Sequence, residues 1–408
     1  MSKKLFIIIL SIVLGLFLTS LVGYYFILQS SNATEPGGIS STFRNFFPFG
    51  NNTSTTTEIV EPITTEPNQS GQPQNYTQKL RKLSSEPVAG AGLLDVKAGT
   101  LVRHIEKATG HIYETELFSP NQNRISNTTI PLTYDAIWGN KNNALVARYL
   151  TEDNKTIETY GLLIKNVSTS TENTMSAVKL LGNIDEVSVF ENSVFTLEQK
   201  DTSSVGYISG FDGTKRTQVW NSPIKKLLSQ YVSAKTIALT TKPHQDNNGF
   251  LFFVDTGNGQ MKKILGGVLG LSTLVDNQAT RVLYLDQTNT PGLFVFDIKN
   301  KLSKDITPTT FPEKCVWGKK NAGTIYCAVP EEFIDRDSLT SWYLGFVSFT
   351  DNIWKYDLKN NTSSLVGSLY TESEKQIDVI KPLLSENEQY FVFINKVDGS
   401  LWSYDLTK

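Results

Sequence analysis

The sequence has few of the residues from which catalytic and metal sites are built. Among its 408 residues are two cysteines and three histidines. Transition-metal sites draw mainly on these two residue types. The chain also lacks a Gly-x-Ser-x-Gly nucleophile elbow and a His-Glu-x-x-His zinc motif. We therefore expect no cofactor and no metal site, and the sequence identifies no catalytic residue.

An excess of either charge is also absent. The chain has 38 Lys and Arg against 40 Asp and Glu, which gives a net charge of −2. Proteins that bind nucleic acids gather Lys and Arg on one surface, and no segment of this chain is rich in them. We therefore expect no nucleic acid partner.

One long apolar segment begins near the N-terminus. Leu5–Leu28 contains no charged residue, and as a helix it would exceed the roughly 30 Å of a bilayer core. Lys3 and Lys4 precede it, which predicts a cytoplasmic tip (1–4), an uncleaved signal-anchor helix (5–28) and an extracytoplasmic remainder at the cell membrane. The alternative is a signal peptide cleaved after Ala33, but the apolar run is longer than the roughly 7–15 residues of such peptides.

A polar segment rich in Ser, Thr, Asn, Pro and Gln follows at 29–76. Such a composition buries too little apolar surface to offset the entropy of ordering, so we expect a disordered linker. Four phenylalanines interrupt it at Phe43, Phe46, Phe47 and Phe49. They are either a docking motif for a partner or the lipid interface, or an incidental apolar cluster.

The remainder of the chain, 77–408, repeats one pattern of short strands and turns about every 43–50 residues, with one longer interval. The apolar third strand of each unit is the clearest sign, as at Phe250–Val254 and Leu401–Asp405. Seven copies of an all-strand unit predict a seven-bladed β-propeller.

The last unit stops at Lys408, directly after its third strand. The missing fourth strand is expected at the other end of the domain, because Thr77–Leu83 is similar to the fourth strand Gly259–Leu265. We therefore predict that 77–84 completes the final blade and covers its exposed edge.

The two cysteines flank a predicted hairpin turn at Lys320–Gly323. Counting outward from Asn321 places Cys315 opposite Cys327 on adjacent strands, at a separation that suits a disulfide. We predict a structural disulfide in an exported protein. The alternatives are two buried thiols or a metal site, and the latter lacks nearby histidines.

The final unit resembles the TolB-type and WD40-like repeat, a Leu-Ser-turn, an apolar strand, Asp-Gly and an aromatic-Asp-Leu strand. The matching residues are Leu384–Ile394 and Asp398–Leu406, although Glu386–Glu388 replaces the usual Pro-Asp-Gly turn. Pro312–Trp317 and Ile325–Pro330 resemble segments of membrane-anchored propellers from minimal-genome bacteria. The resemblance implies the propeller fold and an envelope location. TolB-like relatives bind envelope proteins, and no activity is assigned to the minimal-genome relatives.

Acidic residues recur near the start of the first strands of several units, at Asp135, Asp185, Glu313 and Asp378. In a propeller these positions gather on one face around the channel, where they could bind a cation or a basic peptide. The ordinary explanation is that Asp favours turns. Core packing explains two tryptophans at equivalent positions nearby, which we keep as candidates for the same face: Trp138 and Trp317.

The longer sixth unit carries an insertion between its second and third strands, Glu331–Trp342. Long loops on rigid scaffolds often carry function, and the alternative is a plain surface excursion. The candidate residues of this loop are Asp335, Arg336, Asp337 and Trp342.

These observations predict a non-catalytic scaffold. We expect a membrane-anchored head in the cell envelope that binds envelope proteins, a peptide or a small ligand on one propeller face. The alternative is an exported hydrolase or lyase with a carboxylate-lined channel.

Overall fold

The computed structural model describes residues 78–126, 128–153, 155–165, 174–321 and 323–408. The predicted anchor, the predicted linker and its four phenylalanines lie outside these residues. Within the described part of the chain, no helix has the length and apolar character needed to cross a bilayer.

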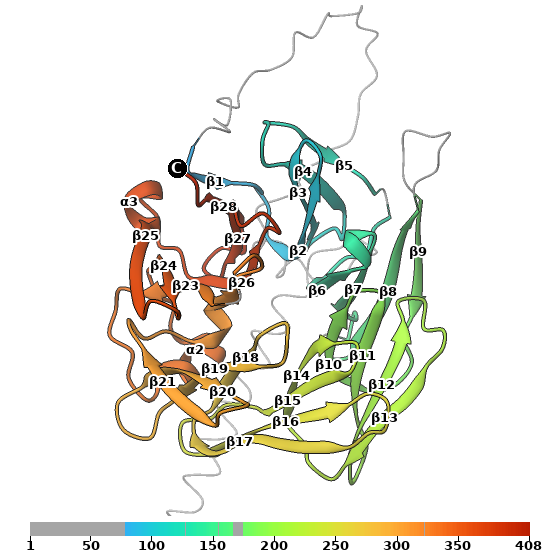
Figure 1. The fold of residues 1–408 in the computed structure, drawn as a ribbon. Coiled ribbons are helices and arrows are strands. Elements are labelled where there is room, and N and C mark those ends of the chain that lie inside the picture. The colour runs from blue at the N-terminus through green and yellow to red at the C-terminus, as the bar shows by residue number, and fades with distance from the viewer. Residues whose placement is uncertain (1–77, 127, 154, 166–173, 322) are drawn as a thin grey trace, which may run out of the picture. The chain divides into compact units, whose positions relative to one another are not determined.

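The described chain forms seven four-stranded antiparallel sheets arranged as a ring (Figure 1). The predicted seven-bladed propeller is therefore confirmed. Blades 1–3 contain β2 (Val88–Val96), β3 (Gly99–Glu106), β4 (Ile112–Glu116) and β5 (Gln122–Arg124); β6 (Thr133–Gly139), β7 (Ala144–Leu150), β8 (Ile157–Lys165) and β9 (Thr174–Lys179); and β10 (Ile184–Phe190), β11 (Ser193–Gln199), β12 (Ser204–Gly210) and β13 (Thr217–Ser222).

Blades 4–7 follow the same order from the innermost to the outermost strand. They contain β14 (Leu227–Ser233), β15 (Thr236–Thr241), β16 (Asn248–Asp255) and β17 (Met261–Leu269); β18 (Ser272–Val275), β19 (Arg281–Asp286), β20 (Gly292–Asp297) and β21 (Leu302–Ile306); β22 (Cys315–Trp317), β23 (Thr324–Pro330), β24 (Asp351–Asp357) and β25 (Thr362–Ser368); and β26 (Val379–Leu384), β27 (Tyr390–Asn395), β28 (Leu401–Asp405) and β1 (Leu80–Lys82).

In the described residues, four short helices join these strands: η2 (Asn140–Asn142), η3 (Pro312–Lys314), α2 (Ser338–Tyr343) and α3 (Leu369–Ser373). The innermost strand of each blade runs from one face of the ring to the other, and the second strand returns. We call the face where innermost strands begin the start face, and the opposite face the end face. Loops between the second and third strands therefore lie on the start face.

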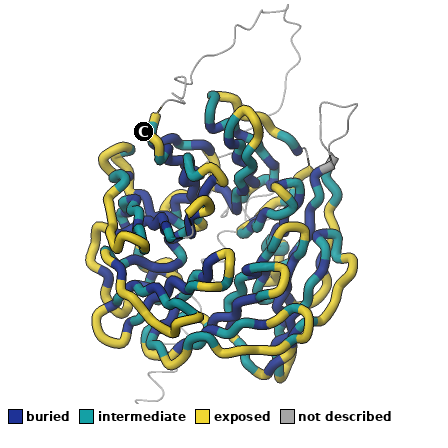
Figure 2. The backbone as a smooth tube through the Cα atoms, viewed as in Figure 1, coloured by how far each residue is buried: buried dark blue, intermediate teal, exposed yellow. Residues whose placement is uncertain are grey.

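The apolar core lies between the blades rather than in one central mass. Seven clusters of buried side chains each join two neighbouring blades, as where Ile105 of blade 1 meets Trp138 and Leu145 of blade 2. The second strand is buried on both faces, so β27 is buried throughout. The outermost strands are the most exposed, which Figure 2 shows as an exposed rim around a buried interior.

The ring is closed by β1, which pairs antiparallel with β28 through Leu80–Tyr404, Arg81–Ser403 and Lys82–Trp402. The prediction that this segment completes the last blade is confirmed. Leu80 joins the core between blades 6 and 7, whereas Leu83 joins the core between blades 7 and 1. One short segment therefore supports two interfaces between blades.

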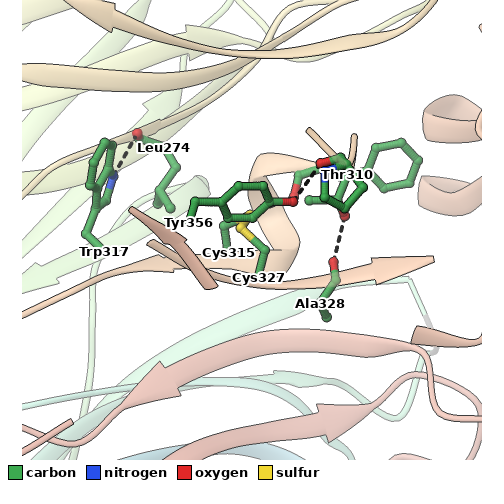
Figure 3. The surroundings of a disulfide bond; sticks show 9 residues. Leu274, Thr310, Cys315, Trp317, Cys327, Ala328 and Tyr356 are labelled. Carbon is green, nitrogen blue, oxygen red and sulfur yellow. Dashed lines mark hydrogen bonds between the residues drawn. A yellow bond between two sulfur atoms is a disulfide. The ribbon is translucent and has the colours of Figure 1, made fainter. Parts of the chain in front are cut away.

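The predicted disulfide between Cys315 and Cys327 is also confirmed. The two residues are direct partners of β22 and β23, with Cα atoms 4.1 Å apart. Figure 3 shows the bond beside the ring of Tyr356. The Tyr356 hydroxyl donates to the Pro308 carbonyl at 2.6 Å, and the Trp317 indole of the same blade donates to the Leu274 carbonyl of blade 5 at 3.2 Å. The bond therefore lies in the interface between blades 5 and 6.

Candidate functional site at the start face

The longest connection on the start face is the segment 331–350 between β23 and β24, which we call the insertion. Its apolar side chains Ile334, Leu339, Trp342 and Phe349 are each less than 10% exposed. They pack with Leu285 of blade 5 and Phe311 in a separate core. The insertion is therefore a packed part of the propeller, and α2 within it lies at the inner ends of the blades (Figure 1).

Hydrogen bonds tie the insertion to blades on both sides of its own. Towards blade 4, the Arg336 guanidinium donates to the Gln245 carbonyl and the Gln245 amide donates to the Thr340 hydroxyl, each at 3.4 Å. Towards blade 7, Lys396 Nζ donates to the Val347 carbonyl at 2.6 Å. The insertion thus lies across the start face from blade 4 to blade 7.

A fully buried ionic cluster lies beneath the insertion. Lys314 of η3 donates to Asp351 Oδ2 and to Asp378 Oδ1, both at 2.5 Å, and all three side chains have no exposed surface. The Val379 amide donates to Asp351 Oδ2 at 2.6 Å, and Lys396 Nζ lies 3.8 Å from Asp378. Buried charges persist only when paired and hydrogen-bonded, so Lys314 fixes how blades 6 and 7 meet.

Asp378 also connects this cluster to the insertion. The Trp342 indole donates to its two oxygens at 3.0 and 2.9 Å, and the Phe349 amide donates to Oδ2 at 3.2 Å. Lys314 Nζ lies 5.2 Å from the Trp342 ring centroid and 5.5 Å from that of Phe349. Two predicted candidates, Asp378 and Trp342, are therefore brought together as an anchor for the insertion.

The buried carboxyl group of Asp351 should make the stability of the folded protein depend on pH. Burial raises the pKa of Asp351 to about 6, whereas an aspartate in an unfolded chain titrates near 4. The folded protein binds this proton more tightly, so the carboxyl contributes stability below about pH 4 that is lost as the pH rises through 6. We expect the wild type to gain about 2 kcal/mol relative to Asp351→Asn between pH 7.5 and 4, measured by urea unfolding. A difference that does not change with pH would contradict this assignment.

The other predicted acids lie at the start face in pairs with basic or polar groups. Asp135 forms an ion pair with Lys381 of blade 7. Asp185 lies 3.7 Å from Lys242 Nζ, which pairs more closely with Glu186 at 2.9 Å. The structure does not gather these acids into one cluster. Among the described residues, no group of three or more His, Cys, Asp or Glu side chains is placed to hold a metal ion.

Glu313 differs from these pairs because its partners are uncharged. Its Oε1 accepts hydrogen bonds from Ser272 at 2.5 Å and from Tyr343 of the insertion, whereas its buried Oε2 has no partner. Burial raises the pKa of Glu313, although its hydrogen bonds oppose this shift. Glu313 therefore joins Ser272 of the innermost strand β18 to Tyr343 of the insertion, and its second carboxylate oxygen has no hydrogen-bond partner.

The channel itself contains a cavity of about 490 Å³ lined by innermost strands of several blades. Trp138 lines it together with apolar side chains and with five polar or charged ones, Asp135, Asn142, Glu186, Lys319 and Lys381. Trp317 packs within the core between blades 5 and 6, as Trp138 does between blades 1 and 2, but Trp317 does not line this cavity. The two tryptophans are at equivalent positions but do not share one site.

The outer side of the insertion carries four large apolar or aromatic side chains in contact with solvent. Phe333 is 79% exposed, Phe346 77%, Leu344 62% and Tyr343 43%. The predicted loop residues Asp335, Arg336 and Asp337 are exposed beside them. We call these four side chains the aromatic patch. Large apolar side chains left exposed on one segment are a feature of binding sites.

Sequence reasoning missed the residues that organise this site. Lys314 and Asp351 belong to the buried cluster, and Tyr343 belongs to the patch, yet none was a candidate. A charged Lys314 directly before the apolar strand Cys315–Trp317 was a usable signal, because a lysine there must find a buried partner. Asp351 at the start of a buried third strand was another.

No protein-family model matches the sequence, and no curated protein shows significant similarity to it. Solved propellers share the fold. The structure of oligogalacturonate lyase from Vibrio parahaemolyticus has a TM-score of 0.54 at 8% identity, over 80% of this chain and 93% of that one. The β-propeller domain of the trilobed protease from Pyrococcus furiosus, which has an open velcro topology, has a TM-score of 0.50 at 14% identity, over 78% and 98%.

TolB from Acinetobacter baumannii is also among the similar structures, with a TM-score of 0.41 at 11% identity. The match covers 70% of this chain and 64% of TolB, so the chain spans less than two thirds of that protein. At such identities these likenesses show the propeller fold alone.

Proposed function

We propose that this protein is a non-catalytic binding scaffold, anchored in the cell membrane by its N-terminal helix and displaying the propeller in the extracytoplasmic envelope. The start face binds a protein or peptide partner through the aromatic patch. The charge-free run Leu5–Leu28 after two lysines supports the anchor.

The observation that carries this proposal is the contrast between the two sides of the insertion. Its inner side is pinned by the buried core and the Asp378 anchor, while its outer side exposes Phe333, Leu344 and Phe346. Binding energy concentrates in large apolar and aromatic side chains held in advance in one conformation. The exposed side chains are thus arranged for a partner at little entropic cost.

The alternative function, an exported hydrolase or lyase, would use carboxylates lining the channel. Asp135 and Asp378 are each held by a lysine, and Glu313 is bound to Ser272 and Tyr343. These carboxylates serve as structural partners, which favours the scaffold.

The test is cross-linking of the full chain in native membranes, followed by recovery of its partners. We expect the variant Phe333→Ser/Leu344→Ser/Phe346→Ser to lose at least about tenfold of the recovered partner, because each hot-spot side chain contributes about 1–2 kcal/mol or more. The matched control replaces three exposed leucines elsewhere on the propeller, Leu181, Leu302 and Leu365, by serine. Equal recovery from both triple variants would refute the role of the patch.

A further inference from the structure

The surface around the aromatic patch is acidic and lacks counter-ions. The insertion contains four carboxylates, Glu331, Glu332, Asp335 and Asp337, and one basic residue, Arg336, which gives it a net charge of −3. Within the described chain, none of the four carboxylates forms an ion pair, and their hydrogen-bond donors are neutral groups such as the Thr350 amide. The negative charge of the insertion is therefore not balanced locally.

Glu313, which contacts Tyr343 of the insertion, is a further carboxylate beside the insertion. In the described chain no ion pair involves Glu313, and its Oε2 is buried without a hydrogen-bond partner. The Tyr343 hydroxyl donates to Oε1 of Glu313, and Tyr343 is 43% exposed and belongs to the patch. An exposed tyrosine ring beside a carboxylate is a favourable place for a guanidinium or ammonium group.

Several other acids of the start face are paired with basic groups, unlike those of the insertion. Asp185 and Glu186 face Lys242, and Arg148 donates to the Asp185 carbonyl at 3.2 Å. Lys381 compensates Asp135. An oppositely charged partner would therefore meet less compensated negative charge at the insertion than at these pairs.

The same charge disfavours two other occupants of the patch. A second copy bound through this surface in a two-fold symmetric dimer would place its acidic insertion against this one. An anionic lipid surface would likewise repel it, since aromatic residues that bind such membranes are accompanied by Lys and Arg.

We propose that the insertion binds a basic polypeptide segment. An apolar side chain of the partner packs among Phe333, Leu344 and Phe346, and a Lys or Arg side chain stacks on Tyr343 beside Glu313. This inference rests on the proposed function and names the chemistry of its partner.

The test uses the purified full chain and a fluorescein-labelled peptide, Lys-Phe-Lys-Leu-Lys-Phe-Lys, with binding followed by fluorescence anisotropy. We expect saturable binding that weakens several-fold between 50 and 300 mM salt, because salt screens exposed charges. The peptide in which Glu replaces each Lys should not bind. Removing the four charges of the insertion, with Glu331→Gln, Glu332→Gln, Asp335→Asn and Asp337→Asn, should weaken binding at least about tenfold.

The matched control removes four charges from turns of the end face, with Glu191→Gln, Asp212→Asn, Asp255→Asn and Asp357→Asn, and should leave binding unchanged. Equal loss in both quadruple variants would overturn the inference, as would binding of the acidic peptide in place of the basic peptide. If the basic peptide does not bind while capture in membranes still depends on Phe333, Leu344 and Phe346, the proposed function stands and the basic partner is refuted.

Discussion

A full chain that lacks Thr77–Leu83 is expected to accumulate as insoluble protein. The deletion removes β1, exposes the edge of β28, and takes Leu80 and Leu83 out of two separate cores. It also removes Arg81, whose guanidinium donates to the Glu116 and Ser119 carbonyls of blade 1 at 3.1 and 2.8 Å. Each buried leucine alone contributes about 2–5 kcal/mol, against a total stability of about 5–15 kcal/mol for a typical domain.

Point substitutions separate the effect of packing from that of chain length. Leu83 is 3% exposed and Leu302 of the outer strand β21 is 68% exposed, so Leu83→Asp should abolish soluble expression and Leu302→Asp should not. The yield of non-aggregated protein after extraction of the membranes with detergent and the midpoint of thermal unfolding are the measurements. A deletion variant with the yield and midpoint of the wild type would show that β1 does not close the ring.

Replacing Lys314 by Met is expected to destabilise the protein by about 3–5 kcal/mol, because it leaves the carboxylates of Asp351 and Asp378 buried without their shared cation. The loss should appear in urea unfolding at pH 7.5. It should also loosen the insertion, since Asp378 holds Trp342, and this is readable as a change in tryptophan fluorescence before global unfolding.

Lys319→Met provides the control, because Lys319 pairs with the exposed Glu386 at the surface and should lose less than about 1 kcal/mol. Removing all three charges, with Lys314→Met, Asp351→Asn and Asp378→Asn, should be less harmful than Lys314→Met alone. If Lys314→Met were no worse than Lys319→Met, the cluster would not stabilise this interface.

The fold could be predicted from the sequence because its signals are local and repeated. The closing strand was visible as a similarity between Thr77–Leu83 and the fourth strand of blade 4, and the disulfide followed from counting out of the turn at Asn321. Both depend only on strand alternation and hairpin register. Among the described residues, Cys315 and Cys327 stand in the predicted register.

The site was harder to predict because it depends on contacts between distant segments. Asp378 was a candidate for a carboxylate ring, yet its function in the fold is set by Lys314 and Trp342, 64 and 36 residues away. Likewise, the pairing of Asp135 with Lys381 spans 246 residues. The sequence marks where such charges lie on the ring but not which charge from another blade meets them.

The closure of the ring by β1 has a mechanical consequence. Three residue pairs join β1 to β28, supported by the Leu83 amide bonded to the Leu401 carbonyl at 2.7 Å and the Asp405 amide bonded to the Lys79 carbonyl at 2.8 Å. Tension carried along the chain from upstream of Gln78 reaches the propeller at these few bonds, before any other blade is loaded. The strand that receives such a force is thus the strand that closes the ring. A sufficient force would separate β1 from β28 and open the ring between them.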